Sequence, residues 1–302
     1  MTDTQLSLFE LAELADEAAV VEAAVTAAPA ADVIVPVAVQ APVGVIALET
    51  ASVPESDAPM VFAGADGSGA LPAWAERLVV FDLETTGIDV ETSRIVTANI
   101  SWLDAKGVVV HRRDWLADPG VEIPEQATAV HGVTTERARA EGRPAAEVVG
   151  EIVGELRRAL GAENALVVYN APYDITLLAR EAVRHGIPPL VSPAPVIDPL
   201  VIDKQIDRYR KGKRTLEVSA AFYGVALTDA HDAGADAIAA GLMAQALGIR
   251  YASELDLSAH DLHRAQAEWH EAQCDSFEDY MRRVRDPSFT ARRGWPEAAR
   301  PA

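Results

Sequence analysis

The chain has 302 residues, and 49% of them are hydrophobic, which is enough for one or two domains with a sizeable buried core. Its single cysteine, Cys274, excludes an intramolecular disulfide and fits a reduced, cytoplasmic compartment. The net charge of −20 argues against a general nucleic-acid binder, but residues 1–75 hold eleven Asp and Glu and no Lys or Arg, so the remainder carries only −9.

The sequence predicts no membrane segment. The most apolar run, VIVPVAVQAPVGVIAL from Val33, is 16 residues long and is interrupted by Pro36, Pro42 and Gly44. The N-terminus also lacks the basic region of a signal peptide. We therefore expect a cytoplasmic protein.

The N-terminal quarter of the chain shows little periodicity. Residues 18–76 are rich in Ala, Val and Pro with scattered acids, and we interpret them as an acidic linker behind a separate short motif in residues 1–17. The alternative is that the Val-rich stretch adds one or two strands to the body.

The body is predicted to begin at Arg77 with three strands. They are LVVFDLETTG, RIVTANISWLD and GVVVHRRDWL, and the tight turn Asp104–Gly107 joins the second to the third. This pattern indicates a three-strand antiparallel meander.

Helices and short strands then alternate up to about residue 250. We expect a helix over AAEVVGEIVGELRRAL, a buried strand ALVVY, a helix from Tyr173 toward His185, a short strand VIDP, a helix TLEVSAAFYG ended by Gly224, and a helix GADAIAAGLMAQALG ended by Gly248. The sequence thus predicts an α/β domain over residues 77–250, with a mixed sheet and helices on both faces. Residues 251–302 form a helical extension, with a long amphipathic helix over 255–284.

Two acidic residues, Asp82 and Glu84, lie at the end of the first predicted strand. A separation of two places both carboxylates on one face, where two anions are costly unless a cation holds them. Solvated carboxylates at a sheet edge are the alternative.

Two further segments place candidate ligands at helix starts. In VVYNAPYD a strand runs into Asn170 and Pro172, so Asp174 falls in a first helical turn; the alternative is a simple helix cap. In AHDAGADAIAA, Gly234 offers a break that leaves His231 on a loop and Asp236 near the helix start; the alternative is a lone surface histidine.

Together the four carboxylates and the histidine predict a hydrolytic metal site. Mg²⁺ and Mn²⁺ prefer oxygen ligands, and two such ions can stabilise the attacking and leaving oxygens of a phosphate displacement. A histidine nearby can accept a proton from the attacking water near neutral pH.

The segments VVFDLETTG, VVYNAPYD and HDAGADA resemble the three motifs of the DEDDh exonucleases, the family of the epsilon proofreading subunit of bacterial DNA polymerase III. The segments VHGVT and RTLEVSAAFYGVAL also look similar to this family. The resemblance covers about Arg77 to Gly248 and implies the ribonuclease-H-like exonuclease fold. A departure is Tyr169, which stands before Asn170 where many relatives have histidine.

The resemblance implies a 3′-to-5′ exonuclease that acts on DNA in proofreading or repair. It implies that Asp82, Glu84, Asp174 and Asp236 hold two Mg²⁺ or Mn²⁺ ions and that His231 is the general base. We also expect Thr85, Thr86, Asn170 and Tyr173 to contact the nucleic acid. An enzyme that trims RNA ends and a non-catalytic adaptor bound to a sliding clamp are the alternatives.

A basic stretch, RYRKGKR, offers a site for DNA phosphates in an acidic chain. It places Arg208, Arg210, Lys211, Lys213 and Arg214 within seven positions, just before the last motif. A solvated loop is the alternative.

The N-terminal pentapeptide QLSLF resembles the motif by which bacterial replication and repair proteins dock on the polymerase sliding clamp. The resemblance implies that Gln5, Leu6, Leu8 and Phe9 contact the clamp. The alternative is an amphipathic helix folded onto the body. No polymerase signature is visible in the chain, so proofreading would require a polymerase as a partner.

Overall fold

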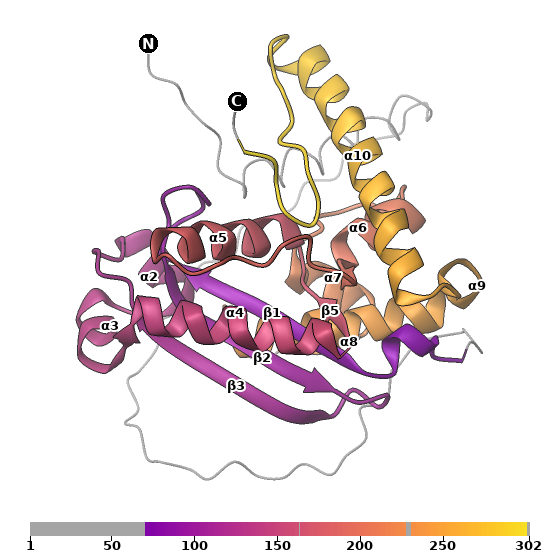
Figure 1. The fold of residues 1–302 in the computed structure, drawn as a ribbon. Helices are drawn as coiled ribbons and strands as arrows, with labels where there is room; N and C mark the ends of the chain where they lie inside the picture. The colour runs from indigo at the N-terminus through magenta and orange to yellow at the C-terminus, as the bar shows by residue number, and fades with distance from the viewer. Residues whose placement is uncertain (1–69, 163, 228–230, 301–302) are drawn as a thin grey trace, which may run out of the picture.

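The computed structural model of the chain describes residues 70–162, 164–227 and 231–300 (Figure 1). The expected clamp contacts Gln5, Leu6, Leu8 and Phe9, and residues 18–69 of the expected linker, lie outside this part. No helix within it is long and apolar enough to cross a membrane.

The folded domain begins before Arg77, where we had placed its start. Residues Ala73–Ala75 form the short helix η1, in which Trp74 is 5% exposed. The Trp74 indole N–H donates to the carbonyl oxygen of Leu255 at 3.0 Å. The end of the expected linker is therefore part of the folded body.

A six-stranded mixed sheet forms the centre of the molecule. Its strands are β1 (Leu78–Thr85), β2 (Ile95–Leu103), β3 (Val109–Asp118), β4 (Arg143–Pro144), β5 (Ala165–Val167) and β6 (Val196–Ile197), in the spatial order β4-β3-β2-β1-β5-β6. The pairs β1–β2 and β2–β3 are antiparallel, whereas β5 runs parallel to β1 and β6 parallel to β5. The predicted meander and mixed sheet are confirmed.

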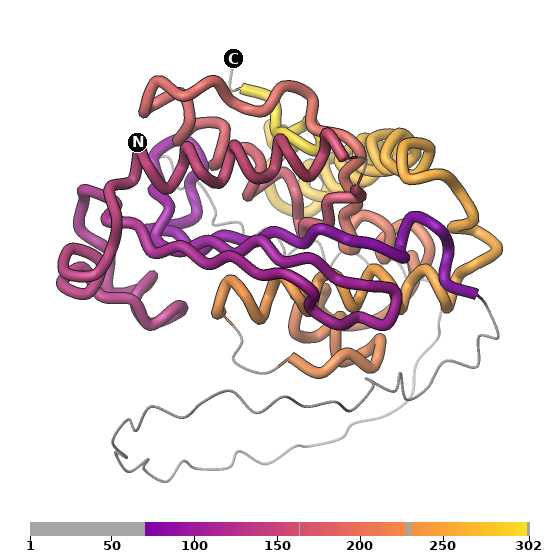
Figure 2. Tube along the Cα trace, turned by 60° about the horizontal axis from the view of Figure 1, so that its bottom comes forward, coloured from indigo at the N-terminus to yellow at the C-terminus, as the bar shows by residue number. Residues whose placement is uncertain are grey.

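Helices cover both faces of the sheet, as predicted (Figures 1 and 2). One face packs against α4 (Ala145–Gly161) and α5 (Ala171–Arg184). The other packs against α8 (Ala233–Arg250), with α6 (Pro199–Ile206) and α7 (Leu216–Phe222) beside it. Two short helices, α2 (Glu125–His131) and α3 (Thr135–Glu141), follow β3. The sheet thus has a separate hydrophobic core on each side.

The helix α8 runs two residues past Gly248, where we had predicted its end. A Cβ atom at Gly248 would lie 3.0 Å from the Pro72 ring and 3.2 Å from the Trp74 ring. The glycine therefore allows η1 to pack closely on α8 and does not terminate the helix.

The C-terminal extension is a helix that returns to the domain. The predicted helix over 255–284 corresponds to α10 (Ala259–Val284), which begins four residues later than predicted and follows the short helix α9 (Ala252–Leu255). The helix α10 packs on β6 and α6. Residues 285–300, which we call the C-terminal strap, fold back toward α5 (Figure 1). There the Ala298 N–H donates to Thr176 Oγ1 at 2.8 Å, and Arg180 pairs with Glu297 at 3.0 Å.

Candidate active site

The strand β1 carries two acids toward α8. Leu78 and Val80 belong to the core on the α8 side of the sheet. Because alternate side chains of a strand share a face, Asp82 and Glu84 continue the same side. Both are only half-buried, at the end of an otherwise buried strand. The face that is apolar along most of β1 thus becomes acidic at its carboxyl end.

The helix α5 brings a third acid to this position. Asp174, in its first turn, is 3% exposed. One carboxylate oxygen accepts a hydrogen bond from the backbone N–H of Leu83 at 3.1 Å. Since Leu83 lies between Asp82 and Glu84 in β1, the three carboxylates are neighbours.

A buried aspartate fixes the start of α5. The N–H groups of Asn170 and Ala171 donate to the Asp198 carboxylate at 3.0 and 2.9 Å. Asn170 has the left-handed backbone angle φ of 60°, and its side chain makes no cap hydrogen bond. The simple alternative for Asn170, a side-chain helix cap, is therefore wrong.

The helix α8 supplies the remaining two groups. Asp232 caps the helix by accepting hydrogen bonds from two N–H groups of its first turn, both at 3.0 Å. His231 lies just before the cap with φ of 70°, and its N–H donates to Asp236 Oδ2 at 3.2 Å. The helix begins at Ala233, so the break falls at Asp232 and not at Gly234, where we had predicted it.

These elements converge on one point. Glu84, His231 and Asp236 each offer a donor atom, and the three atoms lie within 4.8 Å of one another. Burial raises the pKa of Asp82 well above its usual range, and the charges of Asp174, Glu84 and Asp236 raise it further. Burial and the charges of Asp236 and Asp174 raise the pKa of Glu84 to about 8. The metal-free site is therefore strained by its own negative charge.

The site fits a hard divalent cation. The four acids offer carboxylate oxygens, which are the ligands that Mg²⁺ and Mn²⁺ prefer, and the imidazole of His231 lies beside them as a proton acceptor. Asp236 Oδ1 is buried and has no hydrogen-bond partner in the described part of the chain. A cation would satisfy this oxygen and offset the repulsion among the acids.

The residues expected to contact nucleic acid border these acids. Tyr173 in α5 donates from its hydroxyl to the carbonyl oxygen of Gly87 at 2.7 Å and lies 2.5 Å from Thr85 Oγ1. Thr86 Oγ1 accepts from the Arg94 N–H at 2.9 Å. These side chains hold the loop after β1 against α5 at the rim of the site.

The basic stretch divides into two groups, and our expectation needs correction for two of its residues. Arg210 is 7% exposed and pairs with the fully buried Asp203 at 2.7 Å. Arg214 pairs with the same carboxylate, which also accepts from the Tyr223 hydroxyl at 2.6 Å. Both guanidinium groups hold the loop together and are not presented to DNA.

The other three cations, Arg208, Lys211 and Lys213, are exposed. Their loop leads into α7, and the charge of Glu217 in the first turn of α7 is one of the causes that raise the pKa of Asp236. Tyr169, the residue before Asn170, connects this loop to the start of α5, since its hydroxyl donates to the Arg214 carbonyl oxygen at 2.6 Å. The residue that departs from the family pattern thus connects the site to the basic loop.

His131, at the end of α2, is a site neighbour that we did not predict. Its Nδ1 accepts from the Val133 N–H at 3.2 Å, and its Nε2 is buried without a partner within the described residues. Burial lowers its pKa below the usual value for histidine. The VHGVT segment was the signal that could have placed it here.

The comparisons with known proteins agree with this geometry. The sequence model of the exonuclease family RNase_T matches residues 79–242, more than half of the chain. The chain belongs to this exonuclease family. The ribonuclease-H-like exonuclease fold expected from the sequence is therefore confirmed.

Curated relatives of the exonuclease include PolC-type DNA polymerase III from two streptococci. The Streptococcus suis (strain 98HAH33) polymerase is 30% identical over 165 residues, and the Streptococcus sanguinis (strain SK36) polymerase is 29% identical over 164 residues. Each match covers 54% of this chain and 10% of the polymerase. The exonuclease thus corresponds to about a tenth of the length of these relatives.

Among solved structures the exonuclease is similar to E. coli exonuclease I. The complex of that enzyme with a dT13 oligonucleotide gives a TM-score of 0.51 at 19% identity, covering 60% of this chain and 43% of that one. Its zinc-bound complex with single-stranded DNA gives 0.51 at 19%, covering 60% and 42%. At this identity the likeness concerns the fold.

Proposed function

We propose that the exonuclease removes nucleotides from the 3′ end of DNA by metal-dependent hydrolysis. The observation that carries the proposal is the convergence of Glu84, His231 and Asp236, whose donor atoms lie within 4.8 Å of one another beside two further acids. The oligonucleotide complex of the structurally similar exonuclease I supports DNA as the substrate.

The four carboxylates, those of Asp82, Glu84, Asp174 and Asp236, would hold two Mg²⁺ or Mn²⁺ ions. When bound, the ions supply neutralisation of charge on the phosphate and activation of the attacking water. His231 is exposed beside Glu84 and Asp236 and accepts the proton of that water as the general base.

The nucleic acid would enter past the rim of the site. Thr85, Thr86, Asn170 and Tyr173 border the terminal nucleotide, and Arg208, Lys211 and Lys213 attract the phosphates behind it. The exposure of the three cations, on a loop that Tyr169 connects to the start of α5 by a hydrogen bond to the Arg214 carbonyl oxygen, supports this direction of approach.

The test is digestion of a single-stranded DNA oligonucleotide labelled at its 5′ end. The wild type with Mg²⁺ or Mn²⁺ should give labelled products that shorten stepwise from the 3′ end, whereas Asp82→Ala should lose activity by at least about 10³-fold, since no ligand replaces the carboxylate. A matched RNA oligonucleotide distinguishes the RNA-trimming alternative.

Three outcomes would contradict the proposal. Activity that survives in Asp82→Ala would remove the metal mechanism, and a wild type that binds DNA without cleaving it would favour the non-catalytic adaptor. Release of the label as a mononucleotide, with no labelled products of intermediate length, would reverse the assigned direction.

The biological setting is proposed from the relatives and the sequence. The streptococcal matches are DNA polymerases, which supports action beside a polymerase in replication proofreading or repair. Docking on a sliding clamp through Gln5, Leu6, Leu8 and Phe9 stays a prediction from the sequence.

A further inference from the structure

A row of polar side chains crosses the face of the sheet that packs on α8. In β2, Asn99 and Ser101 are fully buried among apolar neighbours. The Ser101 hydroxyl donates to Asn99 Oδ1 at 2.8 Å, and the Asn99 amide donates to Asp114 Oδ1 in β3 at 2.8 Å. On its other side Asn99 is paired in register with Asp82 of the active site. Burying a polar side chain costs free energy unless it is hydrogen-bonded, and these hydrogen bonds offset that cost.

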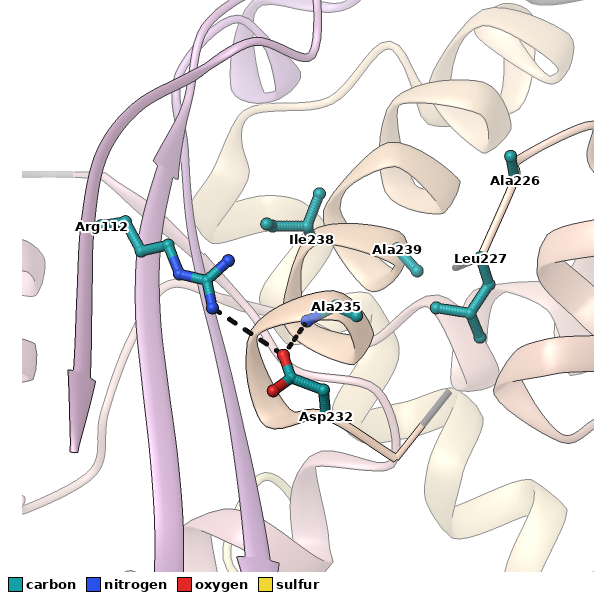
Figure 3. Close-up of a pocket in the computed structure, with 7 residues that line it drawn as sticks. All are labelled: Arg112, Ala226, Leu227, Asp232, Ala235, Ile238 and Ala239. Atoms are coloured by element: carbon teal, nitrogen blue, oxygen red, sulfur yellow. Dashed lines mark hydrogen bonds and ion pairs between the residues drawn. The ribbon is translucent and has the colours of Figure 1, made fainter. Parts of the chain in front are cut away.

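The row continues through Arg112 to the start of α8. The Arg112 guanidinium group donates two hydrogen bonds to the Asp114 carboxylate, of 2.7 and 2.8 Å. Its guanidinium also pairs with Asp232 Oδ1 at 3.8 Å, the oxygen that caps α8 (Figure 3). One side chain thus connects the sheet to the helix cap.

The approach of Arg112 depends on a glycine. A Cβ atom at Gly234 would lie 2.3 Å from Arg112 Nη2, a separation that real Cβ atoms do not show. Only glycine at this position leaves the first turn of α8 open to the guanidinium group.

A cavity adjoins the start of α8 among the residues that the structure describes. A cavity of about 440 Å³ lies between α8 and Leu227, with Arg112 and Asp232 among its lining residues (Figure 3). Apolar side chains of α8, including Ile238, form the rest of that wall. Because this side of the helix faces a cavity, the pair of Arg112 with Asp232 is what connects the cap to the sheet here.

Hydrogen bonds connect the cap residue Asp232 to the site residues His231 and Asp236. The Asp236 N–H donates to the Asp232 carbonyl oxygen at 2.9 Å, and the His231 N–H donates to Asp236 Oδ2 at 3.2 Å. A displacement of Asp232 would therefore carry both site residues with it.

We propose that Arg112 is a positioning residue of the exonuclease: by holding Asp232, it keeps His231 and Asp236 facing Glu84. The inference rests on the proposed function for its reaction, but it concerns the metal site itself. Partners that orient metal ligands commonly change metal affinity or activity by 10–100-fold when removed, roughly.

The test compares Arg112→Ala and Arg112→Lys with a neighbour as control. We expect Arg112→Ala to lower kcat about 10-fold with little change in KM for an oligonucleotide, and to weaken Mn²⁺ binding, measured without DNA from the spin resonance of free Mn²⁺, by a similar factor. Arg112→Lys should restore part of both, because it keeps the charge beside Asp232.

Arg113→Ala is the matched control. Arg113 has similar exposure, but its ion pairs are with Glu155 and Glu151 of α4 on the opposite face of the sheet. It should leave kcat and Mn²⁺ affinity unchanged. Arg112→Lys also keeps the proposal testable if the alanine variant does not fold.

A double variant identifies the route of the effect. If Arg112 acts through Asp232, then Arg112→Ala combined with Asp232→Asn should bind Mn²⁺ no more weakly than the worse single variant. Wild-type Mn²⁺ affinity and kcat in Arg112→Ala would overturn the proposal, as would fully additive effects or a change confined to KM. The Mn²⁺ measurement remains valid even if no DNA cleavage is found, so failure of the proposed function and failure of this inference are distinguishable.

Discussion

At the scale of single residues, Glu84 links metal binding to pH. Its pKa rises to about 8 in the metal-free protein, above its usual value of 4.5, so the folded state holds a proton there that the unfolded chain releases. The stability from this proton is present below about pH 4.5 and is lost as pH rises through about 8. The metal-free protein should therefore lose stability over this window, and a divalent cation should stabilise it more at high pH than at low pH.

The measurement is the Tm with EDTA and with Mg²⁺ between about pH 5.5 and about 8.5. His131, His263 and His270 act in the opposite direction, because burial lowers their pKa values. The difference between the wild type and Glu84→Gln isolates the carboxylate. Equal pH slopes in the two proteins would show that Glu84 is already ionised at neutral pH.

The sequence could place the five expected site residues near element ends, because strand ends and helix starts can be located from local pattern: Asp82 and Glu84 lie in the second half of β1, Asp174 and Asp236 in the first turns of α5 and α8, and His231 just before the cap of α8. Their roles at the metal site stay a prediction. It could not predict Arg112, whose role depends on the pairing of β3 with β2 and on the approach of α8. It also misassigned Arg210 and Arg214, because their partner Asp203 lies in a separate helix and only the folded chain brings them together.

At the scale of elements, the strap joins the C-terminal extension to the helix that carries Asp174. The Trp295 indole N–H donates to Asp198 Oδ2 at 3.3 Å, and the same carboxylate holds the first N–H groups of α5. Trp295→Phe removes this donor and keeps an aromatic ring, so it should lower the free energy of unfolding by about 1–2 kcal/mol. Trp295→Ala should cost more, since the ring also packs against the core and lies 4.9 Å from the His263 ring.

Urea unfolding monitored by circular dichroism checks this. The control is Phe289→Leu in the same strap, because the Phe289 ring makes an edge-to-face contact with Phe277 of α10. Equal losses in Trp295→Phe and Phe289→Leu would mean that the contact with Asp198 does not stabilise α5.

The strap, α6 and the two short helices after β3 were not predicted, whereas the long periodic elements were. In VIDPLVIDKQI the apolar residues fit a short buried strand as well as a helix. In the structure only Val196–Ile197 form a strand, β6, and α6 begins at Pro199 after its cap Asp198. Residues 285–300 show no periodicity in the sequence. Their path in the structure depends on single contacts, those of Trp295 with Asp198 and of Glu297 with Arg180, which local pattern does not predict.

At the scale of the whole molecule, the distribution of charge determines how an acidic enzyme meets an acidic substrate. The chain carries −20, yet the loop beside the site exposes Arg208, Lys211 and Lys213. Reversing two of these charges in an Arg208→Glu, Lys211→Glu variant should raise KM for single-stranded DNA by about 10-fold or more at low salt, with kcat nearly unchanged, because phosphate contacts hold the strand and are not part of the chemistry. The salt dependence of kcat/KM should also become shallower, since fewer counterions are released on binding.

The control reverses a cation far from the loop, Lys106→Glu in the turn between β2 and β3, which changes the net charge by the same amount per residue. If the whole-molecule field dominated, both variants would weaken DNA binding in proportion to the charge added, and about 0.3 M salt would screen both effects alike. If the loop contacts the DNA phosphates directly, reversing its charges should weaken DNA binding much more than Lys106→Glu does. An unchanged salt slope after reversal of Arg208 and Lys211 would mean that DNA reaches the four carboxylates by another face, and the cations of this loop would then serve only its fold, as Arg210 and Arg214 do.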